Sequence, residues 1–385
     1  MEQIIVSKDG ENSIASGHLW IFSNEVRERP EDLPAGELVE VHGQKAGFLG
    51  IGYINPRSLI MVRLLARQRV AVDQTFFERR ISSALKLREG RFEESFRVVN
   101  AESDFLPGLI IDKYEDSVAI QLLTWGMEQK KEMIVAATER VLSPDNIVLR
   151  NESPVRQEEG LSHYTQIVKG GVDQEIMIRI GPLSFLVDLL AGHKTGFYFD
   201  QRENRLLTKQ FAPGATVLDC FSYTCGFGLY ALHFGARRVT FVDSSARVLE
   251  LGQENMKLNK LSGGEFVKAD VFDFLKASDN GYDLVILDPP SFIKSKKKVK
   301  EGEKGYIDLH KKALRRLVDG GHLFTFSCSH HMKKQRFRDI PRIAAYGKVD
   351  LYLLNELSQN IDHPVLLTIP ETEYLKGLIL RVAKR

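Results

Sequence analysis

The stretch VLDCFSYTCGFGLYAL, residues 217–232, predicts the fold of the C-terminal part of the chain. Its apolar start is typical of a buried strand, its glycine-bearing middle of a tight turn, and its end of the first turns of a helix. In open α/β sheets the ligand lies beyond the carboxyl ends of the strands, next to such turns. We therefore expect Gly226 and Gly228 to let the backbone approach a ligand closely.

Further apolar runs of strand length repeat this pattern and are separated by stretches long enough for helices. Continuous apolar strands that alternate with helices favour a parallel sheet covered on both faces. The runs are ATVLDCF (215–221), RRVTFVD (237–243), YDLVILD (282–288) and HLFTFSC (322–328). The sequence thus predicts a doubly wound α/β domain over residues 188–385.

The residues before 188 show two other patterns. Residues 1–72 contain short strand-like runs separated by Gly, Asn and Pro, which favours a small β-barrel. Residues 73–187 combine a helical pattern at 73–92, which Asp73 can cap, with strand-like runs and a second helix-like stretch at 127–142. This mixture predicts an α+β middle domain.

Composition excludes several broad classes of protein. At roughly 150 residues per domain, 385 residues predict two or three domains. The formal charge is only +2, and 43% hydrophobic with 27% charged residues is typical of a globular chain. No apolar run reaches the length of a membrane span, and MEQIIVSKDG does not resemble a signal peptide. Three cysteines are too few for a disulfide framework, so we expect a reduced, cytoplasmic protein.

Positive charge is concentrated in two places despite the neutral total. Residues 291–316 carry a local net charge of +7, and a second basic cluster, HMKKQRFR, covers 331–338. Such runs are commonly solvated faces, but both flank predicted strand ends of one sheet, where phosphate binding is the alternative. The lysines that we expect to bind phosphates are Lys296, Lys297, Lys298, Lys333 and Lys334.

Acidic residues at three strand ends indicate the kind of cofactor. Asp243 follows Asp219 by 24 positions, where a carboxylate can bind ribose hydroxyls, although Asp243 could instead only cap the next helix. Asp270 ends another strand and could accept a hydrogen bond from an adenine amino group. The turn lacks the G-x-G-x-x-G pattern of dinucleotide sites. The arrangement favours S-adenosylmethionine, which has no pyrophosphate that needs a helix N-terminus.

Two further strand ends carry candidate catalytic residues. Asp288 precedes Pro289 and Pro290, which force a rigid exit from the strand and could hold the acid against a planar base, or could simply end the strand. Cys328 leaves the next strand among basic residues, which favour a nucleophilic thiolate. We expect Cys220, by contrast, to be an inert core residue.

A zinc site built from Cys328, His330 and His331 is disfavoured. Adjacent histidines point apart on an extended chain, and the sequence has no second ligand cluster with metal spacing. We therefore expect no metal.

At these residues the chain resembles the RlmI-type family of S-adenosylmethionine-dependent 23S rRNA (cytosine-5) methyltransferases, over nearly its whole length. Several long motifs occur in the order of that family. They are GHLWIFSNEV (17–26), AESDFLPGLIIDKY (101–114), RNESPVR (150–156), GHKTGFYFDQRENR (192–205), CFSYTCGFG (220–228), VDSS (242–245), NMKLNKL (255–261), DVFDFL (270–275), LDPPSF (287–292), FTFSCS (324–329), DHP (362–364) and YLKG (374–377).

The resemblance implies a PUA-like RNA-binding domain over 1–72, an α+β middle domain over 73–187 and a Rossmann-like class I methyltransferase domain over 188–385. It implies ribosomal RNA as the partner and Cys328 as the nucleophile that attacks the base, which Asp288 faces. The residues that it implies for S-adenosylmethionine binding are Phe199, Gln201, Arg202, Asp219, Phe221, Ser222, Tyr223, Thr224, Gly226, Gly228, Asp243, Ser244, Asp270 and Asp288.

The chain departs from the family pattern at two places. Cys225 stands where relatives usually carry glycine, and His330-His331 replaces a Gly-Leu type pair. The choice of cytosine over uracil C5 rests on the resemblance alone. A guanine nitrogen as methyl acceptor, a non-catalytic role in ribosome assembly, and the oligomeric state, a homodimer included, stay open.

Overall fold

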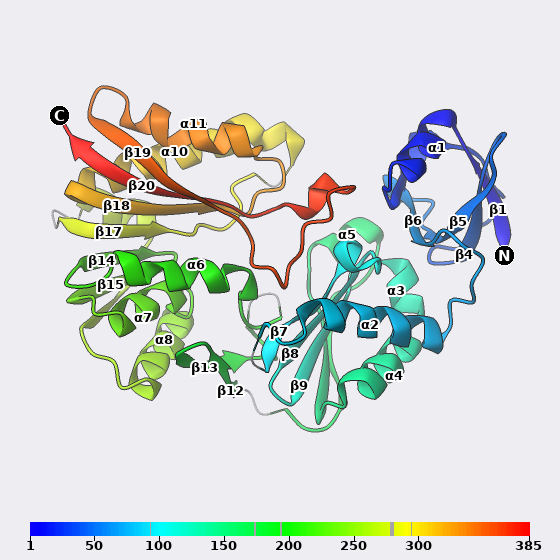
Figure 1. Cartoon of the computed structure of the whole chain (residues 1–385), viewed down its shortest axis with the longest axis horizontal. Helices are drawn as coiled ribbons and strands as arrows, with labels where there is room; N and C mark the ends of the chain where they lie inside the picture. The colour runs from blue at the N-terminus through cyan, green and yellow to red at the C-terminus, as the bar shows by residue number, and fades with distance from the viewer. Residues whose placement is uncertain (93, 173–174, 193–194, 278–280, 294) are drawn as a thin grey trace. The chain divides into compact units, whose positions relative to one another are not determined.

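A computed structural model describes residues 1–92, 94–172, 175–192, 195–277, 281–293 and 295–385. The chain forms two compact units, each built from segments that are distant in sequence. The first comprises Met1–Arg179, Val187–Phe199 and Ile361–Thr372, and the second comprises Ile180–Leu186, Asp200–Asn360 and Glu373–Arg385 (Figure 1). The domain boundaries at 72 and 187 remain predictions.

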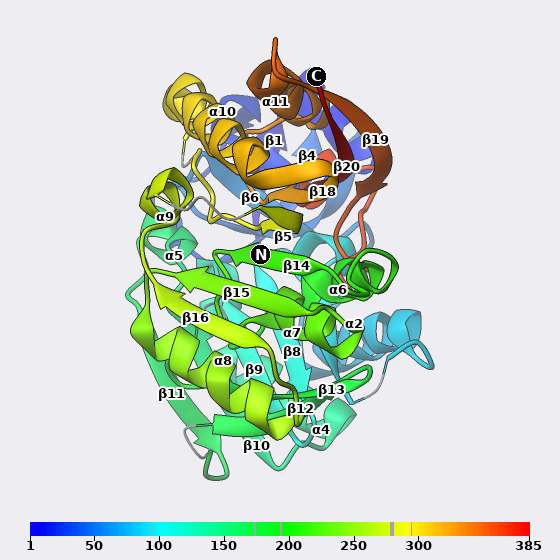
Figure 2. The same ribbon diagram turned by 90° about the vertical axis from the view of Figure 1, so that its left-hand side faces the viewer.

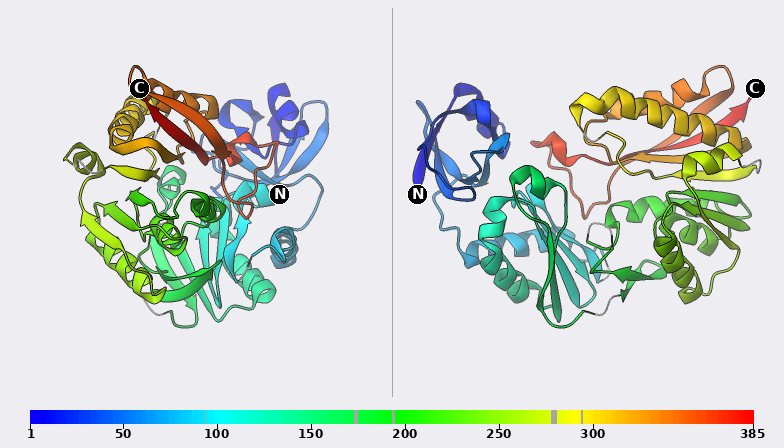
Figure 3. Two further views of the ribbon diagram at one scale, coloured as in Figure 1. Left: turned by 60° about the vertical axis from the view of Figure 1, so that its left-hand side comes forward. Right: turned by 180° about the vertical axis from the view of Figure 1, so that it is seen from behind.

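The N-terminal part of the first unit is a six-stranded sheet in the order β2-β6-β5-β4-β1-β3. Figure 3 shows these strands curling around a common core, as the strand-like runs of residues 1–72 predict. Burial alternates along β4, so that Val39 and Val41 face the core. The elements are β1 (Glu2–Val6), α1 (Lys8–Ala15), β2 (Trp20–Phe22), β3 (Val26–Glu28), β4 (Leu38–Gly43), β5 (Gly47–Ile54) and β6 (Ile60–Ala66).

The rest of the first unit is built on a five-stranded sheet in the order β11-β10-β9-β8-β7. Helix α2 begins after Asp73, whose Oδ1 accepts a hydrogen bond from the Phe76 amide (2.9 Å), so the predicted cap is confirmed. The elements are α2 (Gln74–Arg88), β7 (Ser95–Asn100), β8 (Leu109–Tyr114), β9 (Ser117–Leu122), α3 (Trp125–Gln129), α4 (Lys131–Leu142), β10 (Asn146–Asn151), α5 (Val155–Glu159) and β11 (Tyr164–Lys169). A two-stranded sheet of β12 (Glu175–Ile180) and β13 (Leu183–Asp188) follows.

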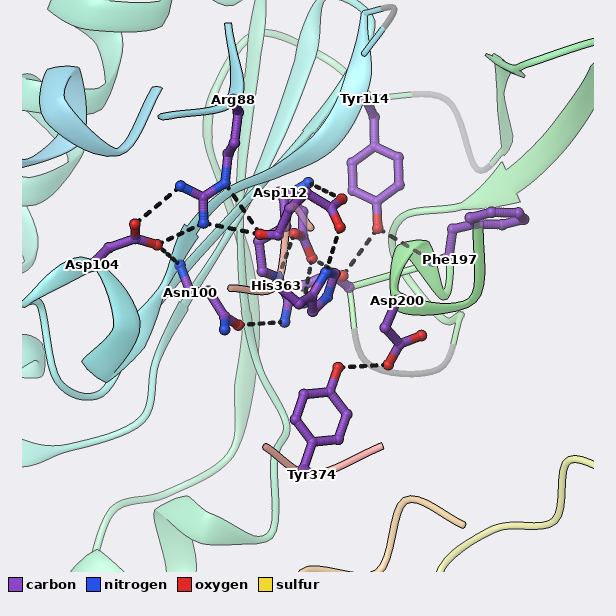
Figure 4. A network of polar contacts seen from close by, with 12 residues as sticks. Arg88, Asn100, Asp104, Asp112, Tyr114, Phe197, Asp200, His363 and Tyr374 are labelled. Atoms are coloured by element: carbon purple, nitrogen blue, oxygen red, sulfur yellow. Dashed lines mark hydrogen bonds and ion pairs between the residues drawn. The ribbon is translucent and has the colours of Figure 1, made fainter. Parts of the chain in front are cut away.

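Buried polar contacts attach two later segments to the first unit (Figure 4). Arg88 pairs with Asp104 (2.7 Å) and donates to the Asp362 carbonyl (2.9 Å). The Thr195 hydroxyl donates to Asp112 (2.5 Å) and accepts a hydrogen bond from Tyr114 (2.9 Å). Because these groups are buried, loss of one partner would leave a polar group unsatisfied. The segments 187–199 and 361–372 are therefore fixed to the first unit.

The second unit contains a seven-stranded sheet in the order β16-β15-β14-β17-β18-β20-β19. Its first five strands are parallel, as predicted, whereas β20 runs antiparallel to both β18 and β19. The strands are β14 (Thr216–Cys220), β15 (Arg238–Asp243), β16 (Gly264–Lys268), β17 (Tyr282–Leu287), β18 (Leu317–Ser327), β19 (Val349–Leu357) and β20 (Lys376–Lys384).

Helices cover both faces of this sheet, so the doubly wound, Rossmann-like architecture is confirmed. On one face Leu218 and Cys220 share a core cluster with Leu309 and Phe337. On the other face α7 packs against β15, and Figure 2 shows α8 across β15 and β16. The helices are α6 (Arg202–Leu206), α7 (Gly226–His233), α8 (Ala246–Leu258), α9 (Val271–Ala277), α10 (Val299–Arg316) and α11 (Lys334–Ala345). None of the helices described is long and apolar enough to cross a bilayer.

Candidate functional site

The carboxyl ends of four neighbouring strands carry the residues that the sequence singles out. In the sheet register Cys220 lies beside Val242 and Leu287, and Leu287 lies beside Thr325. The residues that end or directly follow these strands therefore meet at one edge, where open α/β sheets bind ligands. They are Phe221, Asp243, Asp288 and Cys328.

The turn after β14 is held in a strained conformation. Phe221, Tyr223 and Cys225 have φ angles of 59°, 48° and 67°, a left-handed region that costs a non-glycine residue about 1–2 kcal/mol. The turn is fixed by hydrogen bonds from the Ser222 amide to the Val242 carbonyl (3.2 Å) and from the Cys225 amide to the Ser222 carbonyl (2.7 Å). Backbone strain of this kind is concentrated at ligand sites.

Cys225, one of the two departures from the family pattern, occupies a position that suits glycine because its φ is positive. Its side chain is accommodated by Gly252 of α8, where an added Cβ would lie 2.3 Å from the Cys225 sulfur. The thiol is fully buried, and burial raises its pKa well above the usual range. Cys225 thus shapes the turn and is not exposed to a substrate.

Gly226 and Gly228 each allow a close approach within the protein. A Cβ at Gly228 would lie 2.2 Å from the Phe241 ring, and a Cβ at Gly226 would lie 2.8 Å from Nε of Arg205. These glycines therefore permit close packing of α7 against β15 and against α6. Contact of either glycine with the cofactor remains a prediction.

Asp219 lies beneath the turn rather than on its surface. Its Oδ2 accepts a hydrogen bond from the Gly228 amide (2.8 Å), which places its charge at the N-terminal turns of α7. The carboxyl is 2% exposed, and burial, together with the charges of Asp288 and Asp243, raises its pKa to about 7 against the opposing effects of Gly228 and Arg205.

Replacing Asp219 with asparagine should stabilise the protein above neutral pH. The folded carboxyl ionises near 7 and the unfolded one near 3.8, so the folded state binds an extra proton between these values. The free energy of unfolding therefore falls as the pH rises through that window. At pH 8 the free energy of unfolding of Asp219→Asn should exceed that of the parent by roughly 4 kcal/mol, and the difference should shrink towards pH 4. Urea denaturation without cofactor at several pH values measures this difference in the free energy of unfolding. The control is Asp273→Asn, at an exposed position. A difference that does not depend on pH contradicts the assignment.

Asp243 does not cap the next helix, which was the alternative to ribose binding. Its Oδ2 accepts a hydrogen bond from the Tyr223 amide and its Oδ1 from the Ser245 amide, both at 3.0 Å, and Ser245 is the N-cap of α8. The carboxylate thus joins the strained turn to the end of β15 and keeps acceptor capacity for hydroxyl donors. The neighbouring Ser244 is exposed.

Asp270 is exposed, and its Oδ1 accepts hydrogen bonds from the amides of Phe272 (2.8 Å) and Asp273 (3.1 Å). It therefore holds the start of α9. Its contact with an adenine amino group stays a prediction.

Two buried polar atoms fit a bound polar cofactor. Nε2 of Gln201 and the Ser222 hydroxyl have no hydrogen-bond partner among the residues that the structure describes, and the two residues are 2% and 7% exposed. A buried unsatisfied polar group costs about 1–3 kcal/mol, which a ligand that supplies partners would offset. Arg202 and Thr224 are likewise buried.

Phe199 belongs to the first unit, where its ring lies 5.0 Å from that of Tyr114. Its predicted contact with the cofactor stays a prediction.

Cys328 lies directly after β18 and is the partly exposed one of the three thiols. Burial also raises the pKa of Cys220 well above its usual range, as expected for a core cysteine. Hydrogen bonds on both sides fix the loop around Cys328, because the Tyr306 hydroxyl is hydrogen-bonded to the hydroxyls of Ser327 (2.9 Å) and Ser329 (3.1 Å). The Ser329 hydroxyl is also hydrogen-bonded to that of Ser291 (2.8 Å), which links the Cys328 loop to the loop that follows Asp288-Pro-Pro.

Lys376, which has no role predicted from the sequence, lies beside this loop. Its Nζ donates to the carbonyls of Ser329 (2.9 Å) and Tyr374 (2.8 Å), and the residue is 6% exposed. Burial lowers the pKa of Lys376 to about 8, and the charges of Cys328 and Glu373 oppose that shift. The only signal in the sequence is the motif YLKG, which places a lysine at the start of an apolar strand.

The two basic clusters differ in their partners. Lys296, Lys297 and Lys298 form an exposed 3-10 turn, and within the described residues no ion pair involves them. In the second cluster Lys334 pairs with Glu356 (3.4 Å), Arg336 with Glu303 (2.8 Å) and Arg338 with Glu356 (2.9 Å). Lys333 is exposed. Neighbouring carboxylates thus neutralise much of the second cluster.

Metal-ligating side chains are not clustered in the described parts of the chain, where no group of three or more His, Cys, Asp or Glu could hold an ion. The candidate site therefore consists of an acidic, strained turn next to a rigid loop with an accessible thiol. Such a site can bind a polar cofactor and present a nucleophile beside it.

Known proteins share this architecture and sequence. The model of a PUA-like domain matches residues 4–67, and that of an S-adenosylmethionine-dependent methyltransferase matches 169–332. Ribosomal RNA large subunit methyltransferase I from Pseudoalteromonas atlantica is 38% identical over 384 residues and 97% of each chain. The protein of that name from Tolumonas auensis is 38% identical over 395 residues and 98% of each chain.

Solved structures match the whole fold. A proposed SAM-dependent methyltransferase from Streptococcus mutans matches with a TM-score of 0.86 and 24% identity, over 99% of this chain and all of that one. The structure of SMU.776 complexed with SAH matches with a TM-score of 0.87 at the same identity and coverage. At this identity the likeness shows the fold.

Proposed function

This chain belongs to the ribosomal RNA large subunit methyltransferase I family and is an S-adenosylmethionine-dependent enzyme of that family, and we propose that it methylates C5 of a cytosine in 23S ribosomal RNA through a covalent cysteine adduct. The family relationship supports the substrate class and the cofactor. The geometry of the thiol supports the finer assignment of the reaction.

The cofactor is held by the strained turn and the residues around it. The carboxylate of Asp243 accepts hydrogen bonds from ribose hydroxyls, and the unsatisfied polar atoms of Gln201 and Ser222 supply further contacts. Asp219 keeps the turn in place through the Gly228 amide. When bound, S-adenosylmethionine supplies the electrophilic methyl group.

Cys328 makes the target carbon reactive. C5 of cytosine is a poor nucleophile, but addition of a thiolate to C6 makes C5 enamine-like, so that it can accept a methyl group. A base then takes the C5 proton, and the electrons of that C–H bond re-form the C5–C6 double bond as the C6–S bond breaks and Cys328 leaves as a thiolate. The base must be outside its stack to reach the thiol.

Asp288 stabilises the ring while the adduct forms. The carboxyl is half-buried, follows β17 directly and is fixed by the two prolines after it. Placed near N3 of the cytosine, it can donate a proton or accept a hydrogen bond as electron density moves into the ring.

The partial exposure of Cys328 beside the Asp288-Pro-Pro loop carries the proposal. Methyl transfer to a guanine nitrogen needs no covalent activation, and a non-catalytic assembly factor needs neither the cofactor turn nor this thiol. Uracil C5 uses the same chemistry, so the family resemblance alone favours cytosine.

Incubation with unmodified 23S rRNA and methyl-deuterated cofactor tests the proposal. Nucleoside mass spectrometry should find labelled 5-methylcytidine at close to one methyl group per RNA. Labelled 5-methyluridine would show that uracil C5 is the methyl acceptor, and a labelled methylguanosine would show that guanine is. RNA that stays unlabelled would favour the non-catalytic alternative.

RNA binding should weaken with salt, mainly through Lys296, Lys297 and Lys298, because these lysines are exposed and the second cluster is ion-paired. Each phosphate contact to single-stranded RNA adds about −0.7 to the slope of log affinity against log salt. Replacing all three lysines with glutamine should therefore make the slope of log affinity against log salt less negative by about 2. Fluorescence anisotropy measures the slopes.

The matched control replaces Lys209, Lys257 and Lys260, three other exposed lysines of the second unit, with glutamine. This variant has the same change in net charge and should keep the parental slope. Equal slopes in both variants would show that residues 296–298 are a solvated surface that does not bind RNA phosphates.

A further inference from the structure

The side chain of Lys376 is fixed against the loop that carries Cys328. Strand β20 pairs antiparallel with β18, and Lys376 lies opposite Ser327 in that register. Two of its three N–H groups donate to the carbonyls of Ser329 and Tyr374, so Nζ is held from both sides. At 6% exposure, the charge lies where water screens it weakly.

We propose that Lys376 is a positioning residue for the nucleophile: its ammonium group, anchored by the Ser329 and Tyr374 carbonyls, stabilises the thiolate of Cys328. This inference rests on the proposed function, in which Cys328 attacks the base. It adds the group that makes the thiol reactive before RNA arrives.

The groups that face this pair support the assignment. Cys328 and Glu373 are the titratable groups whose charges act on Lys376, and both favour its protonated form. On the other side of the loop, Tyr306 is bonded to Ser327 and Ser329, and burial raises its pKa, so it stays neutral near neutral pH. Since Lys376 ionises near pH 8, the ammonium form predominates at neutral pH.

Alkylation of Cys328 by iodoacetamide as a function of pH tests the proposal without RNA or cofactor, because only the thiolate reacts. Peptide mapping separates Cys328 from the two buried thiols. Lys376→Met removes the charge and should raise the midpoint of the pH profile by about 1–2 units, with a rate at pH 7 about tenfold or more lower. Lys376→Arg keeps the charge, so the midpoint of its pH profile should stay closer to that of the parent. Lys384→Met, at the exposed far end of the same strand, is the control and should match the parent.

A second measurement leaves Lys376 in place and so does not depend on the folding of Lys376→Met. Because coupling between two groups is mutual, Cys328→Ala should lower the pKa of Lys376, which 15N NMR of its Nζ reports. Unchanged alkylation in a folded Lys376→Met protein, or an unchanged Lys376 titration in Cys328→Ala, overturns the proposal.

Methyl transfer distinguishes this inference from the proposed function. Lys376→Met should lower the rate at pH 7, leave the KM for RNA unchanged, and approach the parent as rising pH restores the thiolate. If Cys328→Ser retains activity, the proposed function fails while the alkylation result still decides the coupling. If Cys328→Ser is inactive and Lys376→Met leaves the pH profile of alkylation unchanged, only the proposed role of Lys376 is wrong.

Discussion

Replacing Cys328 with serine should abolish methyl transfer, by at least about 10³-fold, because the variant lacks the nucleophile. A serine hydroxyl forms no accessible anion near neutral pH, so C6 of the base is not attacked. Binding of S-adenosylmethionine and of RNA should persist, since neither depends on the sulfur. Transfer of a labelled methyl group to 23S rRNA measures the loss, and calorimetry and anisotropy measure the two affinities.

Cys225→Gly is the matched control for loss of a thiol. Glycine suits the positive φ of that position, so the turn should keep its shape and the variant should remain active. Full activity in Cys328→Ser, or inactivity in Cys225→Gly with intact cofactor binding, would show that the nucleophile is assigned to the wrong thiol.

Replacing Asp243 with alanine should weaken S-adenosylmethionine binding tenfold or more. The change removes charge-assisted hydrogen bonds to the ribose, worth about 1.5–3 kcal/mol. It also frees the Tyr223 amide, which Asp243 holds at 3.0 Å, so the turn itself loses a constraint. Isothermal titration calorimetry of the folded variant measures the affinity.

A cofactor analogue with a 2′,3′-dideoxyribose separates the two contributions. If Asp243 binds the ribose hydroxyls, the analogue should bind parent and variant with more similar affinities than S-adenosylmethionine does. Unchanged affinity for S-adenosylmethionine in Asp243→Ala would remove Asp243 from the ribose site. An equal loss for both ligands would assign its effect to the turn alone.

The parallel part of the sheet could be predicted from sequence because each strand is a continuous apolar run bounded by turn residues. β14, β15, β17 and β18 match such runs, and the residues that end or directly follow them form the candidate site. Position relative to a strand end is local information. For that reason Asp243, Asp288 and Cys328 could be selected before the fold was known.

Features that depend on distant pairing could not be predicted in this way. β20 inserts antiparallel between β18 and β19, and this pairing alone brings Lys376 to the loop of Cys328. The partners of Lys334, which include Glu356 on β19, likewise come from a distant strand. The role of Gly228 in helix–strand packing follows from the position of Phe241, which a local turn pattern does not contain.

The most direct test of the covalent mechanism is to trap the adduct with RNA that carries 5-fluorocytidine at the target position. Fluorine cannot leave C5 as a proton does, so elimination is blocked and the enzyme should remain attached to the RNA. Mass spectrometry of the digested complex should place the RNA on Cys328, at close to one adduct per enzyme. An adduct on Cys225, or the absence of any adduct from an enzyme that methylates ordinary RNA, would contradict the mechanism.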